Sequence, residues 1–339
     1  MSLPAYPNTL LDFHQMFPDD SACEDYIIAL RWPDGFACAR CGHNEYWKLK
    51  ARRVIECKSC HQQVCITAGT LMHRTKTELL KWFYGMFLIS TITPGMSSVQ
   101  FQKQMGLKRN ETAFTLLHKI RAAMVNPDRE LLHGVVEVDE TYVGGERRGT
   151  GARGRSLEGK MLVVGVVELR HREGRRIIWD GHGRRELKDV YAGRVRLRVV
   201  TNASAVELEP FLLEHVAPGT EVATDGWSGY RNVSKRGYAH ILVTEEYTVG
   251  KTGVLPMIHR EFGNLKTWLL GTHHGRVEEQ HLQAYLNEFC FRHNRRFWRF
   301  SAFQRVLRLG LRGVSPTYDE LYAAPRLGRG LHPNPAAEG

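Results

Sequence analysis

The spacing of hydrophobic residues changes along the chain, and each change predicts a different kind of secondary structure. Near the N-terminus, DSACEDYIIALRWP places apolar side chains three and four residues apart, which predicts a helix that ends before Pro33. The region from 75 to 125 repeats this helical spacing, whereas strand-like runs such as VVEVDETYVGG and MLVVGVVEL dominate between 135 and 200. A helical stretch at 204–216 then leads into TEVATDGWSGY at 220–230. Strands followed by alternation with helices indicate an α/β domain with a mixed sheet.

Within the helical region, a short helix, a Gly-Leu turn at 106–107 and a longer amphipathic helix follow one another. This order is typical of a helix-turn-helix, whose second helix enters the major groove of DNA. The polar and basic side chains that the second helix would offer are Lys108, Arg109, Asn110, Lys119 and Arg121. A plain three-helix spacer fits the same pattern, because the turn itself has little sequence specificity.

The cysteines indicate a structural zinc site. Two CxxC pairs, with fifteen residues between them, are formed by Cys38, Cys41, Cys57 and Cys60. This spacing predicts one tetrahedral zinc held by four thiolates between short β-hairpins, as in a zinc ribbon. The total of seven cysteines is odd, which fits a reducing compartment better than a disulfide framework. We expect the three cysteines without a partner at ligand spacing to be ordinary buried thiols: Cys23, Cys65 and Cys290.

The charge balance points to a polyanionic partner. The chain has 47 basic and 36 acidic residues, a net charge of +11. A chain this basic usually meets nucleic acid, although a merely basic enzyme is the alternative. A hydrophobic fraction of 42% excludes a disordered chain. The most apolar run, at 82–92, is shorter than the roughly 20 residues that cross a bilayer, and no signal peptide is visible, so we expect a cytoplasmic protein with no membrane partner.

Three carboxylates stand within four positions of the strand VEVDETYVGG (136–145), where an unpaired buried charge is costly. Alternation places Glu137 and Asp139 on one face and Glu140 on the other. Asp225 stands where a second strand ends and a glycine-containing loop begins, a position at which α/β sheets carry ligands. Two aspartates on neighbouring strands suit one or two divalent metals for in-line phosphoryl transfer. Oxygen ligands select Mg²⁺ or Mn²⁺.

Several motifs together carry a family resemblance. The cysteine pairs, VEVDETYVGG, TDGWSGY, and LKTWLLGTHHGR followed by HLQAYLNEFCFRHNRR resemble the insertion-sequence transposases of the ISXO-two-like group, from about residue 12 to 300. The resemblance implies a zinc ribbon joined to a DDE-type catalytic domain with an RNase-H-like fold. It implies Asp139 and Asp225 as the first two metal-binding acids, with Mg²⁺ or Mn²⁺ neutralising Asp139 while Glu137 and Glu140 find basic or solvent partners.

The third catalytic position of this family lies on a helix, usually as an acid seven residues before a lysine. Lys266 stands in the lysine position, where it would hold DNA phosphate near the leaving oxygen, and counting back seven residues gives His259. Imidazole ligates divalent metals, but Mg²⁺ prefers oxygen. Glu261 and Asn264 are therefore alternatives, and a helix-capping or core histidine is the other interpretation of His259. We take His259 as the candidate.

Basic residues elsewhere suit contact with DNA phosphates. The loop GGERRGTGARGRSLEGK (144–160) is rich in glycine and arginine, and RHNRRFWR (292–299) mixes basic with aromatic residues. A solvated hairpin loop is the alternative interpretation of the first stretch. The expected DNA contacts are Arg147, Arg148, Arg153, Arg155, Arg295 and Arg296, with Lys108 and Arg109 of the helical segment.

The sequence thus predicts a multidomain protein. Its expected parts are a helical lead-in (1–34), a small β zinc ribbon (35–72), a helical, helix-turn-helix-like DNA-binding segment (73–127), an α/β RNase-H-like catalytic domain with a mixed sheet (130–300), and a C-terminal helix with a disordered tail (301–339).

The expected function is that of a DNA transposase that cleaves and transfers DNA strands with Mg²⁺ or Mn²⁺. Its expected partner is double-stranded DNA, at the transposon ends and at the target. We expect it to work as a homo-oligomer in the bacterial cytoplasm or nucleoid. The alternatives are a zinc-ribbon DNA-binding regulator, a nuclease that cuts without joining, and a catalytically decayed transposase, which the histidine at 259 keeps open.

Overall fold

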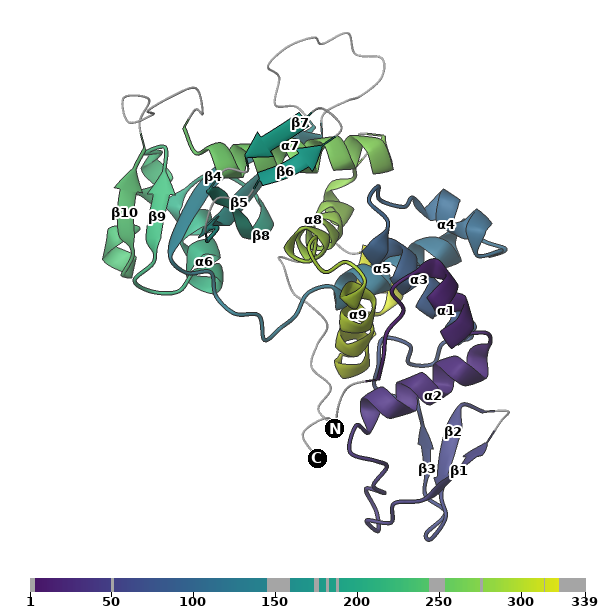
Figure 1. The fold of residues 1–339 in the computed structure, drawn as a ribbon. Helices are drawn as coiled ribbons and strands as arrows, with labels where there is room; N and C mark the ends of the chain where they lie inside the picture. The colour runs from purple at the N-terminus through teal and green to yellow at the C-terminus, as the bar shows by residue number, and fades with distance from the viewer. Residues whose placement is uncertain are drawn as a thin grey trace. The chain divides into compact units, whose positions relative to one another are not determined.

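The structure is a computed structural model, and it describes residues 4–49, 52–144, 159–173, 177–180, 183–186, 189–243, 254–274, 277–313 and 315–322. These residues form two compact units (Figure 1). The first contains the described residues up to Pro127 together with those from Arg295 onward, and the second is Asp128–Asn294. The second unit is therefore inserted, in sequence, into the first.

The second unit is built on a five-stranded mixed sheet with the order β10-β9-β4-β5-β8. Its strands are β4 (Val135–Gly144), β5 (Lys160–His171), β8 (Val190–Val200), β9 (Glu221–Thr224) and β10 (Ala239–Leu242). β5 runs antiparallel to β4 and β8, whereas β9 runs parallel to β4 and β10. A separate antiparallel hairpin, β6 (Ile177–Asp180) and β7 (Gly183–Glu186), lies between β5 and β8 in the sequence. This mixed sheet confirms the predicted α/β class and is consistent with an RNase-H-like domain.

Helices cover both faces of this sheet. On one face, Val136 and Val138 of β4 are fully buried in a core shared with α6 (Ala205–His215). On the other face, valines of β5 and β8 pack with α7 (Pro256–His273) and α8 (Glu279–Asn294). Because side chains alternate along a strand, Glu137 and Asp139 lie on the α7 face. The alternation predicted from the sequence therefore sets which helix meets the acids.

The close approach of α7 to the sheet depends on a glycine in β5. Gly165 is the residue of β5 that pairs with Asp139. A β-carbon at Gly165 would lie 2.7 Å from the Phe262 ring and 3.0 Å from Ile258 Cδ1, both on α7. Glycine at this position therefore lets the helix rest on the strand beside Asp139.

Gly165→Ala is expected to lower the free energy of unfolding by about 1–3 kcal/mol, because overpacking forces α7 away from the sheet. Native-state hydrogen exchange of the α7 amides measures the effect. The matched control is Gly263→Ala on α7, where a β-carbon meets no atom within 4 Å and where alanine favours the helix. Exchange in Gly165→Ala that is as slow as in the control would contradict this account.

The first unit combines helices with a small sheet. The sheet is antiparallel and consists of β1 (Tyr46–Leu49), β2 (Val54–Cys57) and β3 (Gln63–Cys65). The helices are α1 (Leu10–Met16), α2 (Asp20–Arg31), α3 (Leu79–Thr91), α4 (Ser98–Gln104), α5 (Asn110–Ala123), α9 (Ser301–Arg312) and α10 (Tyr318–Tyr322). This architecture agrees with the predicted ribbon and helical segment.

The C-terminal helix α9 packs within the core of the first unit. The ring of Phe303 lies 5.9 Å from that of Phe13 and 5.8 Å from that of Phe83, between ring centroids. The N–H of Leu71 donates to the carbonyl of Gly310 at 2.7 Å. Residues that are far apart in sequence thus share one aromatic core.

The apolar run at 82–92 falls within α3 and its C-cap, and it belongs to this core. Phe83 and Met86 are fully buried. Among the helices that the structure describes, none is both long and apolar enough to cross a membrane. Burial against α9 and the neighbouring helices accounts for the apolar character of α3.

The helix-turn-helix pattern forms as two helices joined by a tight turn. Gly106 has a φ of +58° in this turn, and the Asn110 amide of α5 donates to Gln102 Oε1 of α4 at 3.3 Å. Lys108 and Arg109 are exposed at the start of α5. Arg121, however, is 2% exposed. Its prediction as a surface residue of this helix is wrong, because α5 turns that position into the core.

Candidate active site

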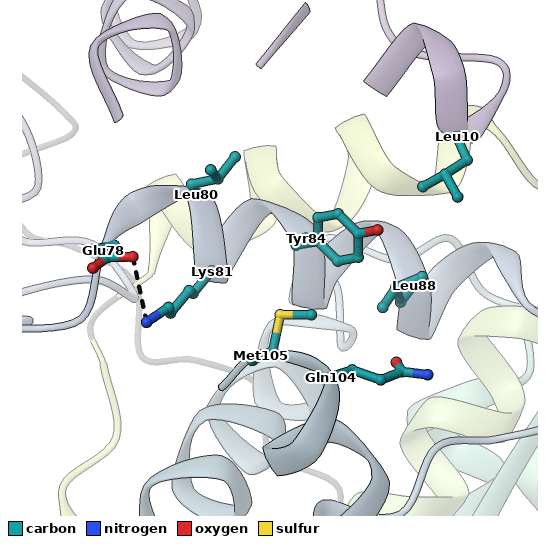
Figure 2. A pocket seen from close by; sticks show the side chains of 8 residues that line it. All are labelled: Leu10, Glu78, Leu80, Lys81, Tyr84, Leu88, Gln104 and Met105. Carbon is teal, nitrogen blue, oxygen red and sulfur yellow. Dashed lines mark ion pairs between the residues drawn. The ribbon is translucent and has the colours of Figure 1, made fainter. Parts of the chain in front are cut away.

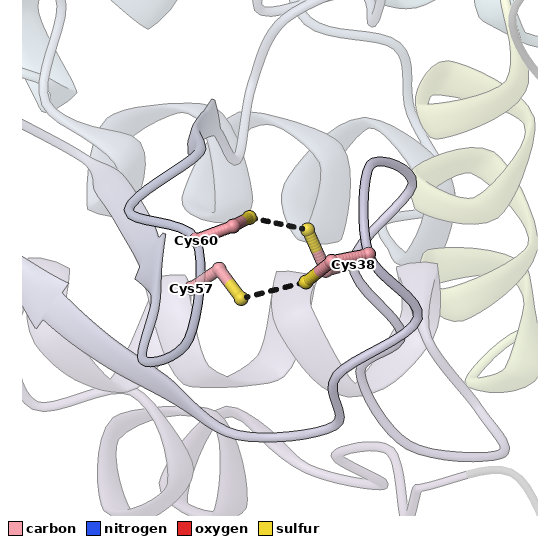
Figure 3. Close-up of side chains that lie close together, drawn as sticks. Cys38, Cys57 and Cys60 are labelled. Carbon is pink, nitrogen blue, oxygen red and sulfur yellow. Dashed lines mark hydrogen bonds between the residues drawn. The ribbon is translucent and has the colours of Figure 1, made fainter.

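Four cysteine sulfurs gather at the ribbon (Figure 3). The sulfurs of Cys38 and Cys60 are 3.5 Å apart, and those of Cys41 and Cys57 are 3.6 Å apart. All four lie within 4.8 Å of one another. Zn–S bonds of about 2.3 Å in a tetrahedron hold sulfurs about 3.8 Å apart. The four cysteines therefore fit a zinc ion with little rearrangement, which confirms the predicted zinc ribbon.

The two CxxC knuckles share one backbone geometry. The N–H of Gly42 donates to the Cys38 carbonyl at 2.8 Å, and the N–H of His61 donates to the Cys57 carbonyl at 3.1 Å. Gly42 and His61 have φ values of +73° and +57°, so both take the left-handed conformation. The backbone N–H of Arg40 lowers the pKa of the Cys38 thiol to about 6, which favours the thiolate that zinc binds.

Asp139 lies on β4, and Asp225 directly follows the neighbouring parallel strand β9. β4 and β9 pair Glu137 with Ala223, and the same register carried two residues further reaches Asp139 and Asp225, just past the end of β9. Burial raises the pKa of Asp139, and the negative charge of Asp225 nearby raises it further. Carboxylates at the same level of neighbouring strands are suited to hold a divalent cation.

A short loop orients Asp225. Its Oδ1 accepts the N–H of Trp227 at 2.9 Å, and the hydroxyl of Thr224 accepts the N–H of Gly226 at 3.2 Å. Gly226 has a φ of +86°, which a side chain would disfavour. The side chain of Asp225 is exposed, so it stays accessible to solvent and substrate.

Glu137 caps the helix that faces these acids. Its Oε2 accepts the N–H of Met257 at 2.8 Å and of Ile258 at 2.9 Å, in the first turn of α7. The N-cap residue Leu255 supplies no side-chain cap, and Pro256 has no N–H. A carboxylate at the positive end of a helix is stabilising. Glu137 therefore fixes where α7 begins relative to β4.

His259 meets Asp139 from α7. Its Nε2 lies 2.7 Å from Asp139 Oδ2, and its side chain is 53% exposed. The helix-capping and core interpretations of His259 do not fit this exposure or this contact. The structure thus places His259 against Asp139, and the strand register places Asp225 beside Asp139. Lys266 is exposed two helical turns further along the same side of α7.

The expectation of basic or solvent partners is wrong for Glu137, which is buried, whereas Glu140 is half-buried and has a tyrosine hydroxyl as its hydrogen-bond partner. Backbone N–H groups of α7 bind Glu137, and the Tyr230 hydroxyl donates to Glu140 Oε1. Burial raises the pKa of Glu140 to about 7, with a further contribution from the charges of Asp139 and Asp225. Tyr230 is fully buried in the 3-10 helix η1 (Ser228–Tyr230), so this bond ties β4 to the loop that carries Asp225.

Glu261 and Asn264, the two alternatives for the third catalytic position, contact each other, and Glu261 also contacts His293 of α8. Glu261 is 2% exposed and lies 3.0 Å from His293 Nδ1, while the Asn264 amide donates to Glu261 at 3.1 Å. His293 Nε2 also lies 3.1 Å from the Gly193 carbonyl of β8. Burial by itself would raise the pKa of Glu261, but the hydrogen bond and the charge of His293 outweigh it and lower that pKa. Glu261 therefore joins α7 to α8 and β8.

The predicted DNA contacts outside the helical segment divide into two groups. Arg147, Arg148, Arg153 and Arg155 lie outside the described residues. Arg295 and Arg296 are half-buried, and the Arg296 guanidinium lies 4.5 Å from the centre of the Phe297 ring.

A groove in the first unit is lined mainly by apolar side chains (Figure 2). It has a volume of about 590 Å³, and its lining comes from α1, α3 and the end of α4. Tyr84, Leu88 and Met105 line it, and an ion pair of 3.3 Å joins Lys81 to Glu78. This mainly apolar lining lacks a cluster of metal-ligating side chains.

Two parts of the chain match known protein families. Residues 131–294 match the ISXO2-like transposase domain, and residues 18–63 match the transposase zinc-ribbon domain. The chain thus contains an ISXO2-like transposase domain and a transposase zinc-ribbon domain. Its transposase domain contains Asp139, Asp225 and His259, and its zinc-ribbon match contains all four clustered cysteines.

A relative of this chain is a protein of Halobacterium salinarum described as an uncharacterized protein in transposable element ISH50. The two are 24% identical over 168 residues, which cover 45% of this chain and 56% of the relative. The chain thus spans little more than half the length of that relative.

Proposed function

We propose that this chain is a DNA transposase that binds the ends of its element and catalyses metal-dependent strand cleavage and transfer. The observation that carries the proposal is the convergence of Asp139, Asp225 and His259, from two neighbouring strands and one helix. A regulator that only binds DNA has no need for these side chains to meet. The convergence therefore favours an enzyme.

Asp139 and Asp225 would hold Mg²⁺ or Mn²⁺ through carboxylate oxygens, with His259 as a third ligand. The chemistry that such an ion supplies is activation of the attacking water or 3′-hydroxyl and stabilisation of the leaving oxygen. Glu137 holds α7, and with it His259, against β4. The bond from Tyr230 to Glu140 holds the Asp225 loop in the same way. Lys266, on the His259 side of α7, would bind a phosphate of the DNA.

The proposed partner is double-stranded DNA, at the element ends and at the target, bound by a homo-oligomer in the cytoplasm or nucleoid. The net charge of +11 supports a polyanionic partner. Lys108 and Arg109, exposed where α5 begins, would contact the duplex, and the arginines at 147, 148, 153 and 155 would contact phosphates close to Asp139. Arg121 is buried and Lys119 is half-buried, so the N-terminal end of α5 offers its most accessible basic side chains.

The test of this function is cleavage of a duplex that carries the ends of the chain's own element, with Mg²⁺ or with Mn²⁺. We expect strand breaks at the element's border that require the metal, followed by joining to target DNA. Breaks without joining would favour the nuclease. Duplex binding without any break, with either ion, would favour the regulator or the decayed transposase.

His259 and Glu261 should differ sharply when each is replaced. His259→Ala is expected to lower cleavage about 100-fold or more and to weaken Mn²⁺ binding measured by calorimetry, because one metal ligand is lost. His259→Glu should keep or improve activity with Mg²⁺, since a carboxylate suits that ion better than imidazole. Glu261→Gln should lower stability while Mn²⁺ binding stays unchanged. Full activity of His259→Ala, together with loss of Mn²⁺ binding in Glu261→Gln, would reverse the assignment.

A further inference from the structure

The six residues 295–300, Arg-Arg-Phe-Trp-Arg-Phe, expose three large aromatic side chains in succession. The exposed fractions are 58% for Phe297, 67% for Trp298 and 45% for Phe300. We call these six residues the aromatic turn. Single exposed apolar residues are common on proteins, but adjacent large rings indicate a surface that binds something.

The aromatic turn is held by hydrogen bonds. The N–H of Trp298 donates to the Arg295 carbonyl at 2.8 Å, and the Ser301 hydroxyl donates to the Trp298 carbonyl at 2.9 Å. Arg299 Nη1 donates to the hydroxyl of Thr93, just past α3, at 2.7 Å. The turn leads directly into α9, whose Phe303 is fully buried. The exposed rings are therefore mounted on a packed helix, which reduces the entropy lost on binding.

Cationic side chains stand on either side of the adjacent rings. Three of the six residues are arginines, and the guanidinium of Arg296 lies 4.5 Å from the centre of the Phe297 ring. The Phe297 and Trp298 rings are 6.0 Å apart and nearly perpendicular, with an interplanar angle of 83°, so they present differently oriented faces. Flat apolar faces among positive charges match a ligand that combines planar groups with negative charge.

Nucleic acid with unpaired bases has this chemistry. A paired duplex offers phosphates but keeps its base faces stacked, whereas an opened strand offers both. A second copy of this chain is disfavoured as the partner at this surface, because the turn itself is basic and would meet its own charge.

We propose that the aromatic turn binds unpaired DNA bases, with Trp298 and Phe297 stacking on the bases and the arginines contacting adjacent phosphates. The proposal rests on the proposed function and deepens it: the DNA that this transposase handles is opened while bound. The arginines supply attraction for any strand, and the rings supply the preference for opened DNA.

The experiment measures binding of the full-length, zinc-loaded chain to two probes, without added Mg²⁺ or Mn²⁺. One is a duplex of the element's end with a short internal stretch of unpaired bases that includes 2-aminopurine, and the other is the same duplex fully paired. We expect the wild type to bind the opened probe about tenfold more tightly and to quench the 2-aminopurine, since stacking on one aromatic ring is worth about that factor.

Trp298→Leu keeps an apolar side chain but removes the larger ring, and it should remove most of the preference and of the quenching while affinity for the paired duplex stays within about twofold. Trp298→Phe should retain both. Equal weakening on the two probes, or no change on either, would overturn the proposal. A changed oligomeric state with unchanged DNA affinity would also overturn it and would assign the turn to a protein interface. Failure of the wild type to bind either probe would instead overturn the proposed function, and this inference with it.

Discussion

Replacing Asp139 or Asp225 with asparagine is expected to lower metal-dependent cleavage of an element-end duplex by about 10³-fold or more, because a hard anionic ligand worth several kcal/mol is lost. Folding and DNA binding should remain. An amide has nearly the shape of the carboxylate, and Asp225 is exposed while Asp139 is only half-buried. Cleavage rates with Mg²⁺ and with Mn²⁺, measured beside DNA affinity, check both parts of the prediction.

Glu137→Gln is the matched control, since Glu137 lies on the same strand and the same face as Asp139. The glutamine carbonyl oxygen still accepts the N–H groups of Met257 and Ile258, and only the charge at the start of α7 is lost, at a cost of about 0.3–1 kcal/mol. Activity should therefore fall far less than in Asp139→Asn. If the two variants are equally inactive, the position of α7, and not the carboxylate of Asp139, limits the reaction.

Cys38→Ser is expected to release the zinc and unfold the ribbon. Binding of structural zinc contributes about 10–16 kcal/mol of apparent free energy to small metal-dependent folds, so the ribbon has no other comparable source of stability. Metal analysis of the purified protein and hydrogen exchange across β1, β2 and β3 measure the two effects. Exchange in the sheet of the second unit should stay as in the wild type.

The control for this change is Cys65→Ser. Cys65 lies in the same small sheet, but its sulfur contacts the hydroxyl of Thr67 at 3.4 Å and does not belong to the cluster of four. It should keep the full zinc content. A zinc-free wild type, purified without chelator, would contradict the assignment of the cluster.

Local patterns in the sequence predicted the parts of the site that depend on spacing along one segment. Alternation in β4 placed Glu137 and Asp139 on one face, and the CxxC pairs placed four sulfurs in one cluster. Helical periodicity put His259 and Lys266 on one side of α7 and Glu261 on another. Each of these depends on the repeat of a single strand, knuckle or helix.

The partners of the buried acids did not follow from the sequence, because they lie far along the chain. Glu137 binds N–H groups more than a hundred residues away, and Glu140 binds Tyr230, which is 90 residues further along the chain. One signal did exist for the first contact. Val254 and Leu255 before Pro256 offer no Ser, Thr, Asp or Asn to cap the helix, so a cap from elsewhere was required. Nothing in the local pattern identifies which acid supplies it.

The packing of α9 has a consequence for synthesis of the chain. Phe303 completes a core whose other rings, including Phe13 and Phe83, belong to the first hundred residues. On the ribosome, those residues emerge long before α9, while Asp128–Asn294 emerges whole in between. The unit with the zinc ribbon and helix-turn-helix is therefore the last to be finished, and a prematurely terminated product that lacks α9 leaves its aromatic core open to water. During translation, the core of the first unit can therefore close only on chains that already carry Asp139, Asp225 and His259.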